Sequence, residues 1–148
     1  MSRLLISDAN ILIDLEVGGL ILDLFKLPYQ IQVPEMLFAD ELEADHGYLL
    51  EHGLRLGELS AASMVEVAIL VNKYKQPSRY DCFALQLAKQ EQIEVKGTLW
   101  VVESLVSQNI IDLVSARKAY ALMKNNGRRL PWELTEKRLQ TLQSGDKE

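Results

Sequence analysis

The chain has 148 residues, 48% of them hydrophobic and 25% charged, with a formal net charge of −5. This length and apolar content suit one domain with a continuous core, and the single cysteine, Cys82, cannot form an internal disulfide. No apolar run approaches the roughly 20 residues of a membrane-spanning helix, and the first residues lack a signal-peptide pattern, so we expect a cytoplasmic protein.

The first part of the chain predicts a βαβ arrangement. Leu4–Ser7 and Ile31–Val33 are short apolar runs of strand character. Between them, the pair Gly18-Gly19 divides the helical pattern into two short helices, over Ile11–Val17 and Leu20–Leu27. Two strands with helical material between them are expected to pair in parallel.

The remaining sequence continues this alternation and then becomes helical. The predicted elements are a helix over Pro34–Leu50, a strand over Leu54–Leu59, a helix from Ser60 or Ser63 to Tyr74, a helix over Asp81–Ala88, a strand over Ile93–Lys96, and helices over Leu99–Ser107, Leu113–Lys124 and from Pro131 onward. The pattern predicts an α/β fold with a central parallel sheet and a helical C-terminal extension. We expect one domain over residues 1–143 and a disordered tail over 144–148.

Three acids are notable for their positions in this pattern. Asp8 ends the first strand, Glu41 lies in the helix after the second strand, and Asp81 begins the helix after the loop at Pro77. Open α/β sheets bind ligands beyond the carboxyl ends of their strands, and three carboxylates there would suit Mg²⁺. Such a cation can activate water for attack on a phosphodiester. The net negative charge does not exclude this, because a divalent cation offsets the carboxylates and bridges them to phosphate.

Each of these acids also has a purely structural interpretation. Asp81 could be an N-cap, Glu41 a solvated helix residue, and Asp8 a turn or capping residue with Asn10 in a similar role. Asp14 is expected to be structural or to support the ligands from behind. Other reactive groups occupy ordinary positions: His46 and His52 are predicted on the surface, and Cys82 in the core.

Four segments, taken in order, resemble the motifs of the PIN domain family of metal-dependent ribonucleases, of the toxin type. They are Ile6–Leu15, Val33–Leu42, Pro77–Ala88 and Ile93–Trp100, and Gly127–Pro131 near the end is similar as well. The resemblance implies a three-layer α/β/α fold, hydrolysis of RNA, an antitoxin protein as partner and a homodimer.

The resemblance also assigns roles to individual residues. It implies that Asp8, Glu41 and Asp81 bind Mg²⁺ or Mn²⁺ and are catalytic, with Asn10 and Asp14 behind them or structural. Four side chains could contact RNA phosphates, although each is of a kind that is more often a solvated surface charge: Arg79, Lys96, Arg128 and Arg129.

The chain departs from the family in one place. Family members have a further strand, ending in a fourth acidic motif, before the last strand, whereas here Ala88–Gln92 leads directly into Ile93–Gly97. No aspartate occurs after Asp81 until Asp112. The missing strand would lie beside the first strand. Either the segment is missing from this sequence but present in the natural protein, or Ile93–Lys96 takes its place, or another copy pairs with the sheet.

Three functional hypotheses follow. The leading one is a metal-dependent endoribonuclease, and the alternative is a catalytically impaired PIN-fold module that binds protein or RNA. A third is an aspartyl phosphotransferase or phosphatase site beginning at Asp8. That chemistry usually needs a second aspartate two positions later, where this chain has Asn10.

Overall fold

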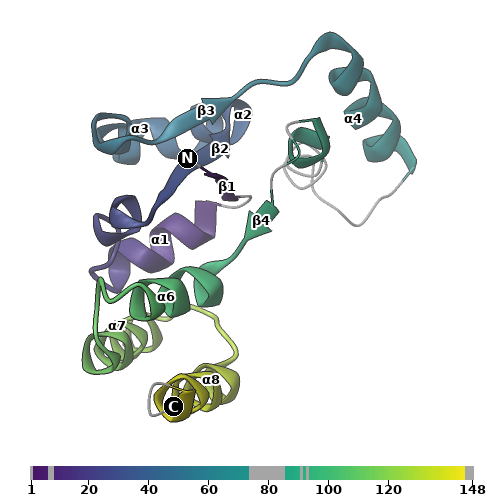
Figure 1. Ribbon diagram of the computed structural model, residues 1–148. Coiled ribbons are helices and arrows are strands. Elements are labelled where there is room, and N and C mark those ends of the chain that lie inside the picture. Colours follow the sequence, from purple (N-terminus) through teal and green to yellow (C-terminus); the bar gives the residue numbers. More distant parts are fainter. Residues whose placement is uncertain (1, 7–8, 74–85, 91, 93, 146–148) are drawn as a thin grey trace. The chain divides into compact units, whose positions relative to one another are not determined.

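The computed structural model describes residues 2–6, 9–73, 86–90, 92 and 94–145 (Figure 1). They form a mixed α/β fold that is mostly helical and contains one small parallel sheet. The elements are β1 (Ser2–Ile6), α1 (Ala9–Val17), η1 (Asp23–Lys26), β2 (Tyr29–Pro34), α2 (Glu35–Leu37), η2 (Phe38–Leu42), α3 (Glu43–His46), η3 (Gly47–His52), β3 (Arg55–Gly57), α4 (Ala61–Lys73), β4 (Glu94–Lys96), α6 (Thr98–Ser107), α7 (Leu113–Asn125) and α8 (Trp132–Gly145), and residues 86–90 are also helical.

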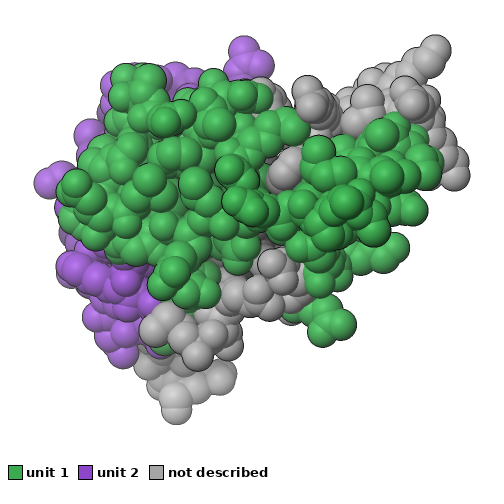
Figure 2. All heavy atoms as spheres, turned by 90° about the horizontal axis from the view of Figure 1, so that it is seen from above, with its two compact units in different colours: residues 1–11, 28–96 green, residues 12–27, 97–148 purple. Residues whose placement is uncertain are grey.

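The chain divides into two compact units (Figure 2). Unit 1 comprises residues 1–11 and 28–96, and unit 2 comprises residues 12–27 and 97–148. Among the described residues, no helix is long and apolar enough to cross a membrane. The single domain over residues 1–143 stays a prediction. The first two residues of the expected disordered tail, Ser144 and Gly145, belong to α8, and residues 146–148 lie outside the described part.

The sheet belongs to unit 1, and its four strands are parallel in the order β3-β2-β1-β4. Leu4 pairs with Ile31 of β2, and Ile6 pairs with Lys96 of β4. β4 therefore lies beside β1, the position that the resemblance gives to the missing strand. The three explanations for that departure stay predictions.

Burial in β2 explains its central position. Ile31, Gln32, Val33 and Pro34 are consecutive and all buried. Strands of parallel sheets that are covered on both faces show such continuous burial instead of alternation. Pro34 has no N–H to donate, so it suits the last position of the strand and the N-cap of α2.

The helical segment after β2 differs from the single regular helix that the sequence predicts. It consists of α2, a π-helical turn at η2, the short α3 and the 3-10 turn η3, and it ends at Gly53, which has a φ of 111°. A π turn contains one extra residue, and this shifts which side chains face inward. His46 is nevertheless buried, because it lies four residues after the buried Leu42 and three before the buried Leu49, on the inward face. Its predicted surface position is therefore wrong, whereas His52 is exposed as predicted.

Unit 2 contains residues 12–17 of α1, η1 and the helices α6, α7 and α8, whose bounds lie close to the predicted ones. Its buried side chains recur at helical spacing along α1, α6 and α7, as in Leu12 and Leu15 or in Ala116, Ala119 and Met123. Among the unit's elements, α6 packs against η1, α7 and α8, and α7 packs against α8.

The glycine pair after α1 has two separate functions in unit 2. A Cβ at Gly18 would lie 2.7 Å from Cε of Met123, so a side chain there would collide with α7. Gly19 has a φ of 77° and reverses the chain after the helix. The predicted second helix, over Leu20–Leu27, is shorter than expected, because only Asp23–Lys26 forms helical turns, of the 3-10 type.

Candidate functional site

The carboxyl ends of the four strands share one edge of the sheet in unit 1, because all the strands are parallel. β2 and β3 lie on one side of β1, and β4 lies on the other. The strands that follow β1 are therefore added on one side of it up to β3, and β4 is then added on its other side. In open α/β sheets, ligands bind beyond the strand ends at such a switch point, so this edge is the candidate site.

Lys96 is the predicted site residue that the structure places most directly. It is the last residue of β4, its side chain is half-buried, and it pairs with Ile6, the last residue of β1. In the sequence, Asp8 follows Ile6 by two residues. A lysine at this end of β4 is suited to hold an anionic group at the candidate edge.

The structure describes only part of the predicted acidic triad. Asp8 and Asp81 lie outside the described residues, as does Arg79. Glu41 lies in the π turn η2 and is exposed, and Asn10 is exposed on α1. Among the described residues, no group of three or more His, Cys, Asp or Glu side chains is placed to hold a metal ion. The donor set of the triad consists of carboxylate oxygens, which chemically suit Mg²⁺ and Mn²⁺.

Two further carboxylates lie at the same edge and were missed by the sequence analysis. Glu35 follows the last residue of β2 and Glu58 follows the last residue of β3, and those last residues, Pro34 and Gly57, pair in the sheet. The negative charge of Glu58 raises the pKa of the Glu35 carboxyl, with smaller contributions from burial and from a hydrogen bond between the two side chains. Their position directly after a strand is visible only in the structure, because the predicted second strand ends at Val33 and the predicted third strand runs to Leu59, past Glu58.

The backbone around Glu58 is fixed by Gln90. The side-chain Nε2 of Gln90 donates to the carbonyl oxygen of Glu58 at 3.1 Å, and its Oε1 accepts from the backbone N–H of Ser60 at 2.9 Å. Ser60 Oγ then accepts from the N–H of Ser63 at 3.1 Å, so Ser60 caps α4, one of the two predicted caps. One amide side chain therefore joins the end of β3 to the start of α4.

Asp14 has a different role from the predicted metal ligands. It is 5% exposed, and its carboxylate accepts a hydrogen bond from Oγ1 of Thr98 at 2.9 Å and another from Nε of Arg128 at 2.6 Å. All three residues belong to unit 2. The carboxylate thus ties α1 to the first turn of α6 and to the loop before α8, which agrees with the structural alternative for Asp14.

The two C-terminal arginines predicted to contact phosphate have unlike surroundings. Nε of Arg128 is bound to Asp14 and its side chain is only 24% exposed, whereas Arg129 is exposed. Their contact with RNA stays a prediction. The sequence could not distinguish them, because the partner of Arg128 lies 114 residues away in the chain.

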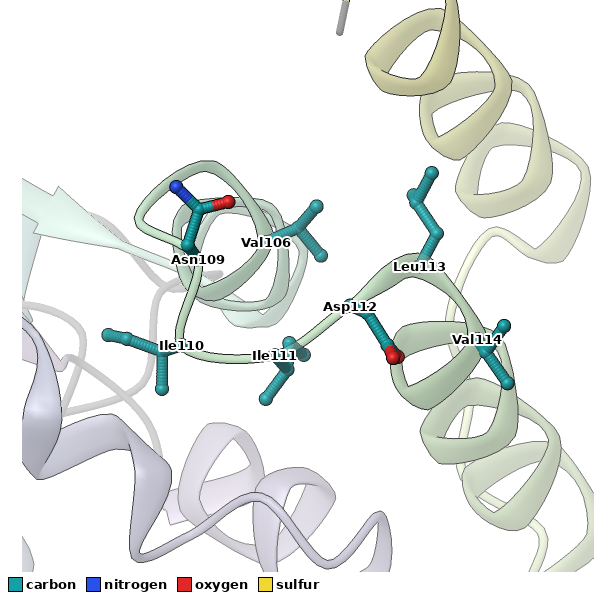
Figure 3. Close-up of a pocket in the computed structure, with 7 residues that line it drawn as sticks. All are labelled: Val106, Asn109, Ile110, Ile111, Asp112, Leu113 and Val114. Carbon is teal, nitrogen blue, oxygen red and sulfur yellow. The ribbon is translucent and has the colours of Figure 1, made fainter.

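Unit 2 contains a hollow of about 610 Å³ at the loop between α6 and α7 (Figure 3). Its lining combines apolar side chains with polar groups, and the carboxylate of Asp112 accepts from the N–H of Ser115 at 2.7 Å as the N-cap of α7. That hydrogen bond lowers the pKa of Asp112. None of the predicted site residues lines this hollow, which is formed by Val106, Asn109, Ile110, Ile111, Asp112, Leu113 and Val114.

Comparison with known proteins adds no relative. No family model, no curated protein and no solved structure matches the chain.

Proposed function

We propose that this chain is a metal-dependent endoribonuclease of the PIN type, with a three-layer α/β/α arrangement around its sheet. The observation that carries the proposal is the strand order β3-β2-β1-β4, with all strands parallel. This order makes the end of β1 the switch point of the sheet. The acid that the sequence supplies directly after β1 is Asp8.

The proposed site combines Asp8, Glu41 and Asp81 as ligands of Mg²⁺ or Mn²⁺. A divalent cation held there would supply Lewis-acid stabilisation of the charge that develops on phosphoryl oxygens. Lys96, at the end of β4, would bind and orient a phosphate of the RNA by its positive charge. Glu35 and Glu58 would add negative charge along the same edge and favour a cation over a free anion there.

A biological setting follows from the same proposal. We place the protein in the cytoplasm as the toxin of a toxin–antitoxin pair, acting on RNA, forming a homodimer and inhibited by an antitoxin protein. These parts rest on the resemblance alone.

The direct test is RNA cleavage by Asp8→Asn. We expect metal-dependent cleavage of a single-stranded RNA to fall by about a hundredfold or more, because even groups that only support metal ligands change activity 10–100-fold. Asp45→Asn is the matched control, since Asp45 is an exposed acid of α3. Circular dichroism would verify that both variants fold. Cleavage by Asp8→Asn at the rate of the unchanged protein would contradict the proposed site.

One observation favours a second function. No aspartate lies between Asp81 and Asp112, so the fourth acid of the family has no counterpart in that stretch. A site with fewer carboxylates holds a cation more weakly. The second candidate is therefore a PIN-fold module that binds RNA or protein without cleaving it, and metal binding distinguishes the two functions.

A further inference from the structure

Positive charge is concentrated in the last two helices. The stretch Asp112–Gly145 contains seven lysines and arginines and three acids, in a chain whose net charge is −5. Nucleic acids attract such a stretch because lysine and arginine displace the counterions of phosphates. The acidic chain as a whole lacks this attraction, so any surface that binds a polyanion through charge must be local.

Ion pairs neutralise three of these bases. Arg128 pairs with Asp14, Arg117 pairs with Glu136 at 3.3 Å, and Arg138 binds both carboxylate oxygens of Glu103, with Nη2 2.7 Å from Oε2. Four other bases of this stretch are exposed and have no ion pair within the described part of the chain: Lys118, Lys124, Arg129 and Lys137. Two exposed acids of this stretch lie outside these three ion pairs: Asp112, which caps α7, and Glu133.

Trp132 lies among these charges. It lines a hollow of about 220 Å³ with Lys124 of α7, and it also lines a second hollow, of about 510 Å³, with Lys137 of α8. The indole ring meets the Tyr120 ring edge-on, with centroids 6.3 Å apart and planes at 75°. Tyr120 is buried, so it holds the half-buried indole from within.

We infer that α7 and α8 form a binding surface for single-stranded RNA, with a base stacked on Trp132 and phosphates bound by Lys124 and Lys137. Aromatic side chains next to lysines are the usual means of binding single strands without reading their sequence. An acidic peptide would use the lysines but would leave the indole without a stacking partner. The choice of RNA rests on the proposed function, whereas the surface itself rests on unit 2.

The test uses the full chain with Trp100→Phe, which leaves Trp132 as the only tryptophan of the two in the sequence. A single-stranded RNA oligonucleotide is titrated in EDTA, so that divalent cations take no part. We expect Trp132 fluorescence to be quenched and the affinity to fall with added salt. Lys124→Glu and Lys137→Glu should each weaken binding about tenfold and reduce the salt slope by about 0.7.

The control is Lys26→Glu, a reversal of an exposed lysine on η1, which should leave the affinity unchanged. Unaltered binding by both Lys124→Glu and Lys137→Glu would overturn the inference, and so would equal quenching by polyglutamate. If RNA quenches Trp132 but the unchanged protein cleaves no RNA with Mg²⁺ or Mn²⁺, the proposed function is wrong and the surface stands. If cleavage occurs without the quenching, the surface is wrong and the nuclease stands.

Discussion

At the scale of single residues, two aspartates of unit 2 form ion pairs that differ in their exposure to water. Asp14 is nearly inaccessible and is bound by Thr98 and Arg128. Asp23 is an acid of the same unit whose ion pair, with Lys26 at 2.9 Å, is exposed. Burial decides what each pair contributes, because water competes with an exposed pair and not with a buried one.

Asp14→Asn is therefore expected to destabilise the protein by about 3 kcal/mol, the lower end of the cost of breaking a buried ion pair, because Arg128 retains some exposure. An asparagine keeps the size of the side chain but removes the charge that Arg128 faces. Asp23→Asn is the matched control and should cost less than about 1 kcal/mol. Urea denaturation measures both free energies of unfolding. Equal losses of unfolding free energy in the two variants would show that the ion pair of Asp14 stabilises the protein no more than the exposed pair of Asp23 does.

The carboxylate pair of Glu35 and Glu58 also belongs to the residue scale. The raised pKa of Glu35 means that the folded protein holds this proton more tightly than the unfolded chain does. Stability from this group is therefore complete below its ordinary pKa and is lost as the pH rises through the raised value. Where both carboxylates are charged they repel each other, and a bound cation would relieve that repulsion.

At the scale of elements, the spacing of apolar residues and the residues that end helices and strands predicted most of the secondary structure. The strands β1 to β4 and the helices α6 to α8 lie close to their predicted ranges, since apolar runs and capping residues are local signals. The π turn at η2 was not predictable, because an extra residue in a helical turn leaves the composition unchanged. The interior position of His46 follows instead from its helical spacing to the buried Leu42 and Leu49, which its polar neighbours in the sequence outweighed in the prediction.

Contacts between elements that are far apart in the sequence could not be predicted from it either. The pairing of β4 with β1 joins residues about ninety positions apart, and the sequence left it as one of three explanations. For the candidate site, Lys96 is predicted from the sequence only as a contact to RNA phosphate, and its place at the edge comes from the structure. Glu35 and Glu58 are not predicted, because they come together only when β2 pairs with β3. The roles of Asp8 and Asp81 stay predictions.

Gly57 shows how tightly β3 is packed in unit 1. A Cβ at this position would lie 2.5 Å from Cδ2 of Leu87 and would also collide with Nε2 of Gln32, and both side chains are buried. Gly57→Ala should therefore destabilise the protein by about 1–3 kcal/mol through overpacking. Because Gly57 directly precedes Glu58, the change should also disturb the carboxyl edge.

Gly47→Ala is the control, because Gly47 has nothing within 4 Å of an added Cβ and has helical dihedral angles. This substitution should be neutral or stabilise by about 0.4–1 kcal/mol, since alanine restricts the unfolded chain. Thermal unfolding of both variants measures the contrast. If the Gly57→Ala protein is as stable as the Gly47→Ala protein, Leu87 can move away from the added Cβ without any loss of stability, and the prediction is wrong.

At the scale of the whole molecule, the charge distribution bears on how a nuclease of this type would function. The chain has a net charge of −5, yet the stretch Asp112–Gly145 has an excess of basic residues. A nuclease with a net negative charge repels the phosphates of its RNA substrate. A cation at the sheet edge of unit 1 and a basic surface on unit 2 would each reduce this repulsion in a different way. The first would offset the carboxylates that hold the cation, and the second would attract the phosphates of an RNA.

This division predicts that Mn²⁺ stabilises the protein by specific binding and not only by screening its negative charge. At a Mn²⁺ concentration one hundred times the dissociation constant, linkage gives about 2.7 kcal/mol, or a rise in Tm of about 5–10 °C for a chain of this length. NaCl at equal ionic strength should not reproduce the rise, and Asp81→Asn should abolish it, whereas Asp45→Asn should keep it. Lys124 is not one of the proposed metal ligands, so Lys124→Glu should show the full rise. A rise that survives in Asp81→Asn would remove Asp81 from the metal site, and the absence of any rise at millimolar Mn²⁺ would favour the binding module over the nuclease.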